Sequence, residues 1–304
     1  MADVPAGPTY RAHVASRYWR RLEALIAEIA GAGHAAALSE RCGLPVDSVQ
    51  LLLDNYCNEA RVGLGLVEPS LRPGLHVLEV GSGIGLLASA LAAEGVDVVG
   101  VEPGAAGFGF MPALASIVST HAGEPPPFAA LPIGVAELDP DAHGRFDLIY
   151  SVNVLEHLME LDEAVAAMSR VLAPGGTMVH MCPNYAAPYE PHFTMPLIPG
   201  APRLTRYLFP KRVRLYPGLW EELNFITAGR LRRLAERNAL EISFDRGMMG
   251  DMVRRILTDP ILARRQGRLV RLAATIVRAS GALAIVDRIP PSLATPMTAR
   301  LSRP

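Results

Sequence analysis

The spacing of apolar residues divides the chain into three parts. In the first part, 1–68, residues 10–62 place them three or four positions apart, which is typical of amphipathic helices. Residues 69–250 alternate short apolar runs with stretches of helical spacing. Residues 251–304 return to helical spacing and carry ten arginines, three aspartates and no glutamate. We predict a helical N-terminal cap, a central domain and a helical C-terminal insertion, with helices at 17–30, 35–42 and 46–55 in the cap and at 252–257 and 261–286 in the insertion.

In the central part, strand-like runs alternate with helix-like stretches. This alternation is typical of an α/β fold, in which a doubly wound, mostly parallel sheet has helices on both faces. A last alternating segment, 297–303, predicts an edge strand that returns to the sheet. Residues 183–225 are rich in proline and aromatic residues and predict a structured loop or lid. The other expected elements are strands at 75–80, 96–101, 131–135, 146–151, 176–182 and 240–245, and helices at 84–94, 105–119, 153–172 and 227–237.

Composition limits the classes of function. Half of the 304 residues are hydrophobic and the formal net charge is −1, so a sizeable core is expected and a general nucleic-acid surface is not. Three cysteines without C-x-x-C spacing, no evident signal peptide and no apolar run of membrane-spanning length predict a cytoplasmic protein. The basic tail is most simply a packed, solvated insertion, and the alternative is peripheral contact with the inner face of a membrane.

The most informative motif is a strand that runs directly into a glycine turn. Glu79 stands two residues before Gly81, and Gly83 and Gly85 follow at alternate positions. Glycine tolerates positive φ and lets a ligand approach the backbone closely. The next strand ends at Glu102, where a carboxylate can accept hydrogen bonds from ribose hydroxyls. These residues predict a nucleoside site.

The spacing of the glycines and the charge beside them narrow the choice of nucleoside. Dinucleotide dehydrogenases carry G-x-G-x-x-G, whereas this turn reads G-x-G-x-G. Glu79 would lie poorly beside a pyrophosphate but well beside an ammonium group. A cationic ligand without phosphate therefore fits better than NAD.

Three further segments accompany the turn Glu79–Gly85, namely Val98–Glu102, Phe146–His157 and Arg170–Gly176. In order and spacing, the four segments resemble the motifs of class I S-adenosylmethionine-dependent methyltransferases. The resemblance covers about 70–250. It implies a seven-stranded Rossmann-like sheet and S-adenosylmethionine as the cofactor.

The resemblance also implies where the cofactor would lie. Glu79 would be near its amino group, Glu102 on its ribose, and Asn153 beside the reactive methyl. Where many relatives carry aspartate and alanine for the adenine, this chain has Val135 and Ala136, so the adenine contact would fall to backbone groups or to Glu137. The residues that would pack under the methionine and ribose are Gly81, Ser82, Gly83 and Gly85.

Methyl transfer to a hydroxyl needs a base for its proton, or a metal that lowers its pKa. Asn153, Glu156 and His157 are spaced i, i+3, i+4, so a helix starting at Asn153 would present all three on one face. His192 in the expected lid would complete a set of four ligands for Mg²⁺ or another divalent cation. Without a metal, His192 and His157 are the leading base candidates, followed by Tyr189 with Tyr185 and Glu190.

This layout resembles two metal-using branches, the ubiquinone-pathway O-methyltransferases and the small-RNA 2′-O-methyltransferases. Those carry Glu-x-x-Glu-His, whereas Asn153 here replaces the first glutamate. We predict a methyltransferase that acts on an oxygen of a small or lipid-like acceptor. The alternatives are RNA 2′-O-methylation, although nucleic acid is not favoured as a partner, and a non-catalytic cofactor-binding protein.

Overall fold

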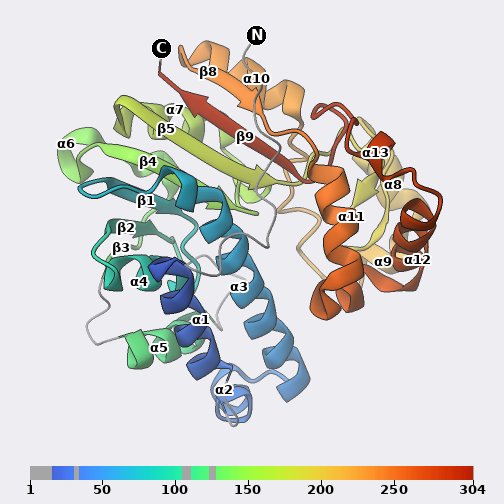
Figure 1. The fold of residues 1–304 in the computed structure, drawn as a ribbon, viewed down its shortest axis with the longest axis horizontal. Helices are drawn as coiled ribbons and strands as arrows, with labels where there is room; N and C mark the ends of the chain where they lie inside the picture. Colours follow the sequence, from blue (N-terminus) through green and yellow to red (C-terminus); the bar gives the residue numbers. More distant parts are fainter. Residues whose placement is uncertain (1–15, 31–33, 105–110, 123–127, 304) are drawn as a thin grey trace.

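The computed structural model describes residues 16–30, 34–104, 111–122 and 128–303. Its centre is a seven-stranded sheet with helices on both faces (Figure 1). The strands are β1 (His76–Val80), β2 (Asp97–Val101), β3 (Ala129–Leu131), β4 (Phe146–Val152), β5 (Leu172–Cys182), β8 (Glu241–Phe244) and β9 (Met297–Ser302). Their order is β3-β2-β1-β4-β5-β9-β8, and only the two pairings made by β9 are antiparallel. The strand order reverses between β1 and β4, where folds of this kind bind ligands.

One face of the sheet is covered by five helices from the first 122 residues. Ser16 caps the first of them by accepting a hydrogen bond from the backbone N–H of Trp19 at 3.3 Å. The apolar stripe of that helix shares one core with Val77, Leu148 and Val179 of the sheet. The five helices are α1 (Arg17–Ile29), α2 (His34–Cys42), α3 (Val46–Val67), α4 (Leu86–Ala93) and α5 (Met111–Ala122).

The opposite face has a second core, because neighbouring strand residues point to opposite sides. Leu78, Ile149 and Met178 are each adjacent in sequence to a residue of the first core, and all three belong to the second. Three helices cover this face: α6 (Pro140–His143), α7 (Leu161–Val171) and α10 (Ala228–Arg237).

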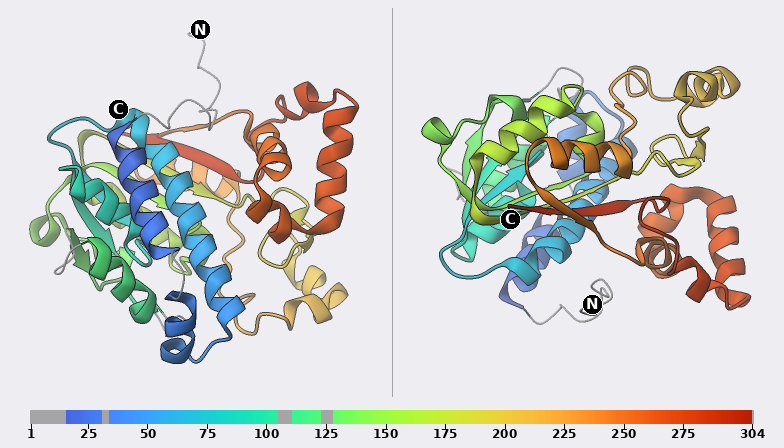
Figure 2. Two further views of the ribbon diagram at one scale, coloured as in Figure 1. Left: turned by 60° about the horizontal axis from the view of Figure 1, so that its bottom comes forward. Right: turned by 90° about the horizontal axis from the view of Figure 1, so that it is seen from above.

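The remaining elements lie beyond the carboxyl ends of the parallel strands, on the right of Figure 1. They come from two separate stretches of the chain, and Figure 2 shows both at the same end of the molecule. The first stretch contains β6 (Tyr189–Glu190), β7 (Met195–Pro196), α8 (Pro202–Leu208) and α9 (Pro210–Val213), and the second contains α11 (Met248–Thr258), α12 (Pro260–Ala279) and α13 (Leu283–Val286).

The predicted fold class is confirmed, but β9 is not the edge strand that its alternating pattern suggested. It lies between β5 and β8, and four of its six residues are buried. An inner strand that is covered on both faces needs apolar or small residues on both sides. Thr298 and Ala299 are adjacent and therefore point to opposite faces, and both are fully buried.

Two predicted elements that follow strands differ from the structure, and a third is described only in part. β3 ends at Leu131, and Val135–Glu137 forms a 3-10 turn in place of the expected strand. The helix expected to start at Asn153 begins at Leu161, after a separate 3-10 turn at Leu155–His157. The helix predicted at 105–119 is described only from Met111 onward, so residues 105–110 lie outside the described part.

α3 continues twelve residues beyond its predicted end at Asn55, to Val67. Gly63 and Gly65 lower the helix propensity of this stretch. Tertiary packing compensates, because a Cβ on Gly63 would lie 2.7 Å from Leu87 Cδ2, and only glycine lets α3 approach α4 this closely. Among the described helices, none is long and apolar enough to cross a membrane.

Candidate active site

A cavity of about 930 Å³ opens at the carboxyl ends of β1, β2 and β4. Its walls come from the glycine turn, α3, the segment around β6, and the C-terminal helices α11 and α12. Ligand sites in proteins measure roughly 300–1,000 Å³. The cavity is therefore large enough for a cofactor and an acceptor side by side.

The glycine turn after β1 holds the backbone in left-handed conformations that favour glycine. Gly81, Gly83 and Gly85 have φ angles of 70°, 55° and 75°. The backbone N–H groups of Gly81 and Ser82 donate to the carbonyl oxygen of Val101 at 2.8 and 3.1 Å, which ties the turn to β2. A Cβ on Gly81 would lie 2.4 Å from Val154 Cγ2. The turn thus packs closely between β2 and the segment that follows β4.

Two carboxylates flank this turn as predicted. Glu102 accepts a hydrogen bond from the backbone N–H of Gly83 at 3.0 Å and borders the cavity at the end of β2. Glu79 borders a small adjoining cavity of about 50 Å³ together with Tyr56 and Glu59. Burial raises the pKa of Glu79 to about 8, because a carboxylate loses hydration there.

One oxygen of Glu79, Oε2, is buried and has no hydrogen-bond partner within the described residues. An unsatisfied buried carboxylate oxygen is costly, and a bound cationic group would satisfy it. Glu79 therefore has the environment expected of a residue that binds an ammonium group.

The sequence did not indicate that α3 forms a wall of this site. Its extension beyond Asn55 brings Tyr56, Asn58 and Glu59 to the cavity. The sequence contained a signal for this longer helix, because apolar residues continue at helical spacing past the predicted end, and the structure buries them. These positions are Leu53, Cys57, Ala60, Leu64 and Val67.

Asn153 lies at the cavity but not on a helix, so the shared face predicted for Asn153, Glu156 and His157 is wrong. Asn153 has a φ of 54° directly after β4, and its side-chain amide donates to Glu59 Oε1 at 2.9 Å. Asparagine is one of the few residues that tolerate this left-handed conformation. The residue borders the cavity, and its amide nitrogen donates to Glu59 of α3.

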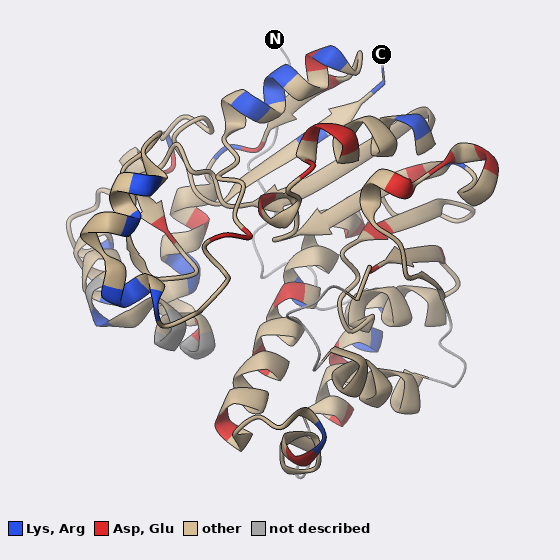
Figure 3. Cartoon of the chain, turned by 180° about the vertical axis from the view of Figure 1, so that it is seen from behind, with Lys and Arg blue, Asp and Glu red and all other residues tan. Residues whose placement is uncertain are grey.

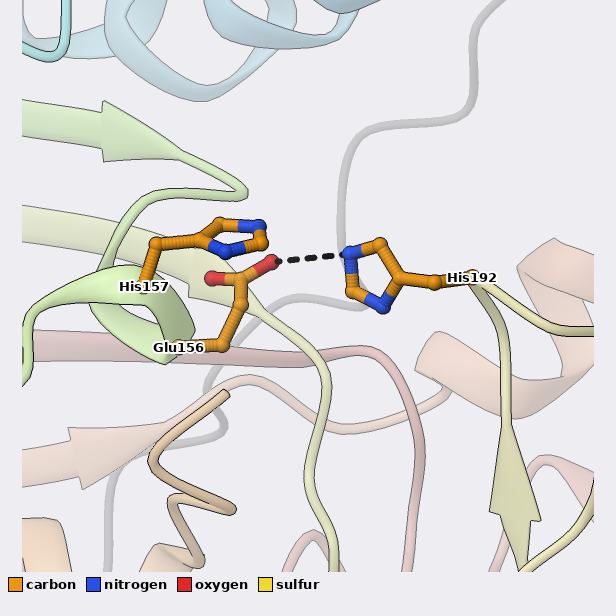
Figure 4. Close-up of side chains that lie close together, drawn as sticks. All are labelled: Glu156, His157 and His192. Atoms are coloured by element: carbon orange, nitrogen blue, oxygen red, sulfur yellow. Dashed lines mark ion pairs between the residues drawn. The ribbon is translucent and has the colours of Figure 1, made fainter. Parts of the chain in front are cut away.

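The 3-10 turn after β4 and the segment around β6 bring Glu156, His157 and His192 together (Figure 4). One potential ligand atom from each residue lies within 4.8 Å of the others. His192 Nε2 is 3.9 Å from Glu156 Oε1, and the two imidazole rings are 5.2 Å apart between centroids. The structure thus brings together three of the four residues predicted as a ligand set, although not on the helix that was expected to present them, and Asn153 is not part of the group.

Glu190 fixes the orientation of His192. Its Oε1 lies 2.7 Å from His192 Nδ1, and its Oε2 accepts the backbone N–H of Phe193 at 2.6 Å. The Tyr185 hydroxyl also donates to Glu190, at 3.3 Å. Because Nδ1 donates to a carboxylate, Nε2 of His192 is left as the acceptor that faces Glu156.

The electrostatics of the cluster are set by burial. Glu156 is fully buried, and neither of its carboxyl oxygens has a hydrogen-bond partner among the described residues. Burial raises the pKa of Glu156 to about 8, and the neighbouring His192 opposes this shift. Burial and the same neighbour lower the pKa of His157 to about 4. Near neutral pH both groups are therefore uncharged when no ligand is bound.

Two other predicted site residues lie away from the cluster. Tyr189 borders the cavity, but its hydroxyl donates to Gln266 of α12 at 2.8 Å. Ala136 lies in the 3-10 turn after β3, where Gly134 and Val135 border the cavity. Glu137 accepts the backbone N–H of Gly134 at 2.6 Å, so its carboxylate is engaged within its own turn.

The fold and the site together define a doubly wound α/β protein with a nucleoside site at the strand ends. The chain belongs to the methyltransferase domain family, whose family model matches residues 53–243. It is a class I S-adenosylmethionine-dependent methyltransferase.

The chain is also similar to individual proteins. An uncharacterised protein of Mycobacterium tuberculosis is 39% identical over 202 residues, which cover 64% of this chain and 67% of that protein. A ubiquinone biosynthesis O-methyltransferase of Azorhizobium caulinodans is 34% identical over 112 residues, 36% of this chain and 42% of that protein. Among solved structures, an S-adenosylmethionine-dependent methyltransferase from Mesorhizobium loti has a TM-score of 0.48 and 18% identity, with 78% of this chain and 95% of that chain covered.

Proposed function

We propose that this enzyme transfers the methyl group of S-adenosylmethionine to a hydroxyl oxygen of a small or lipid-like acceptor. The observation that carries the proposal is the Glu190–His192 pair, in which Glu190 holds Nδ1 and Nε2 lies 3.9 Å from the buried Glu156 at the border of the cavity. In the reaction, the acceptor oxygen bonds to the methyl carbon as the carbon–sulfur bond breaks. The hydroxyl proton passes to His192 Nε2, and S-adenosylhomocysteine leaves.

The surroundings of His192 suit a general base. Its neighbour Glu156 is fully buried, and burial raises the pKa of this carboxyl group to about 8. The hydrogen bond from Nδ1 to Glu190 stabilises the imidazolium formed when Nε2 accepts the proton. Relatives named as ubiquinone biosynthesis O-methyltransferases support oxygen as the atom that is methylated.

The test is the formation of S-adenosylhomocysteine from S-adenosylmethionine with a panel of hydroxyl-bearing acceptors and their O-methyl ethers. Product release with the hydroxyl compounds alone would support the proposal. Methylation of amines but not of hydroxyls in the same panel would refute it.

For the cofactor, we infer that Glu79 binds the amino group, Glu102 the ribose hydroxyls, and Gly81 to Gly85 the face of the methionine and ribose. The positive φ angles of the turn and the unsatisfied oxygen of Glu79 support this placement. Asn153, held by Glu59, would border the sulfonium.

Binding of S-adenosylmethionine at pH 7 is expected to release about one proton from Glu79. The free carboxyl group is protonated because its pKa is about 8, whereas the ammonium group of the cofactor favours the carboxylate. Affinity should therefore rise with pH up to about 8 and then level off. Isothermal titration calorimetry in buffers of different ionisation enthalpy measures the release, and Glu79→Gln should abolish it. Equal heats in all buffers would contradict this assignment.

The same carboxyl group affects stability without cofactor. Its folded pKa of about 8 lies above the unfolded value of 4.5, so its contribution is fully present below pH 4.5 and is lost as the pH rises through about 8. Cofactor binding should offset this loss.

Glu156, His157 and His192 also have the donor types that fit a divalent cation, because two imidazoles and a carboxylate with unsatisfied oxygens converge there. A bound cation would lower the pKa of an acceptor hydroxyl. Under our proposal, we expect enzyme treated with EDTA to retain its methyl transfer rate. The opposite result would be that EDTA abolishes activity and that Mg²⁺ or Zn²⁺ restores it in the wild type but not in Glu156→Gln. That result would show that a metal ion, and not His192 as a base, activates the hydroxyl.

The C-terminal helices also support peripheral contact with an anionic membrane. Basic residues gather at the end of the molecule formed by α8, α9 and α11–α13 (Figure 3). On α12, Leu272 and Ile276 are more than half exposed beside Arg268 and Arg271. We expect the protein to sediment with vesicles that contain phosphatidylserine, and Arg268→Glu with Arg271→Glu to weaken this at low salt by about tenfold. Equal sedimentation with neutral phosphatidylcholine vesicles would argue against an electrostatic contact.

A further inference from the structure

The C-terminal helices present an apolar wall to the cavity beyond the catalytic cluster. On α12, Val270, Ala273, Ala274 and Val277 all border the cavity. Their spacing of i, i+3, i+4 and i+7 places them on one face of the helix. α11 continues the wall with a second set of apolar residues, and those that border the cavity are Met249, Met252, Val253 and Ile256.

This wall is not part of either core of the sheet. Ile256, Leu262 and Ala274 form a separate small cluster with partly buried neighbours. An amphipathic helix normally buries its apolar face against protein. Here α11 and α12 pack against each other through part of these faces, and the same faces also border the cavity. Contiguous apolar surface of this kind marks binding sites.

The wall is continuous with the reaction centre. The same cavity is bordered by His157 and His192 and by the apolar stripe of α12. The hydrogen bond from Tyr189 to Gln266 joins the segment around β6, which carries His192, to α12. A molecule that occupies the wall therefore lies in the same cavity as His157 and His192.

One cation borders the cavity near this wall. Arg255 is the single lysine or arginine among its described lining residues, and its guanidinium donates to Asn58 Oδ1 of α3 at 2.8 Å. Gln266 is the one polar residue that α12 contributes to the lining within the described side chains. Polar recognition is thus concentrated toward α3 and the segment around β6, and the α12 side offers hydrocarbon contact.

We propose that the wall of α11 and α12 binds a long hydrocarbon chain carried by the acceptor, and that it directs the hydroxyl end of that molecule toward His192. The position of the hydroxyl rests on the proposed function, whereas chain binding itself does not. Apolar affinity grows with the area that is buried, by about fourfold for each additional methylene. The site should therefore discriminate acceptors by chain length.

Ala273→Trp is the variant that tests the wall. Ala273 borders the cavity and its side chain is exposed there, so an indole can enter the space that the chain would occupy without overpacking the core. Ala279→Trp is the matched control, because Ala279 is exposed on the same helix and does not border the cavity. Thermal unfolding and S-adenosylhomocysteine titration show whether both variants fold and bind cofactor.

The probe is cis-parinaric acid, whose fluorescence rises in an apolar site, displaced by straight-chain fatty acids of about eight to about sixteen carbons. We expect affinity to increase with chain length until the cavity is filled. Ala273→Trp should weaken binding of the longest acids by at least about tenfold, and Ala279→Trp should match the wild type. Affinity that does not depend on chain length, or that Ala273→Trp leaves unchanged, would overturn the inference.

Chain binding and methyl transfer are measured separately, so their failures can be distinguished. Chain binding with no methylation of any hydroxyl acceptor would refute the proposed function and leave the chain site standing. Methylation of short hydroxyl acceptors without chain-length-dependent binding would refute the chain site alone.

Discussion

His192→Ala is expected to lower the kcat for methyl transfer by about 10²- to 10⁴-fold and to leave the affinity for S-adenosylmethionine unchanged. His192 Nε2 is the nitrogen that would accept the hydroxyl proton, whereas the glycine turn and Glu102, which would bind the cofactor, belong to other elements. Steady-state kinetics gives kcat, and calorimetric titration gives the cofactor affinity. His121→Ala is the control, because His121 lies on α5, where its ring contacts the Ile117 carbonyl and the ring of His34.

The variant Glu190→Gln tests whether His192 acts as a base or has only a structural role. The amide can still bond to His192 Nδ1 but no longer stabilises an imidazolium by charge, so the pH at which kcat rises should move downward. Imidazole added to His192→Gly should restore part of the rate. Normal kcat in His192→Ala with intact cofactor binding would exclude His192 as the base.

Gly81→Ala is expected to cause the largest loss of stability and cofactor affinity among substitutions in the glycine turn. The residue has a φ of 70°, which an alanine adopts at a cost of about 1–2 kcal/mol. Its new Cβ would also lie 2.4 Å from Val154 Cγ2, so the segment after Asn153 must shift. We expect a total cost of about 3–5 kcal/mol in the free energy of unfolding, measured by urea denaturation.

Gly95→Ala provides the matched control. Gly95 has a φ of 79°, but a Cβ added there would meet no atom within 4 Å, so this variant reports the backbone cost alone. A second variant, Gly81→Ala with Val154→Ala, removes both γ-carbons that the new methyl would meet. Recovery of stability in the double variant would show coupling between the two sites. If Gly81→Ala and Gly95→Ala lost equal stability, the steric account would be wrong.

The sequence predicted the glycine turn and the two carboxylates beside it because these features are local in the chain. Glu79, Gly81 and Glu102 lie in one strand-turn-helix-strand unit, where hydrogen bonds between the turn and the next strand fix their relative positions. The alternating pattern also predicted the sheet, since each strand and helix carries its own periodicity. Some predictions failed at the ends of elements, as at Asn153 and Val135, where short turns replaced regular structure. The predicted edge position of β9 failed because the order of the strands depends on packing between distant segments.

The acceptor side could not be predicted in the same way. Glu59 meets Asn153 across 94 residues, and Tyr189 meets Gln266 across 77 residues. Periodicity alone assigns an apolar face to α12 but does not say whether protein or a ligand covers it. Local sequence thus determined the family, the sheet and the cofactor turn, because backbone conformation and neighbouring side chains decide them. Only the tertiary structure decided the wall of α3, the orientation of His192 by Glu190, and the apolar wall of α11 and α12, because these depend on packing between distant segments.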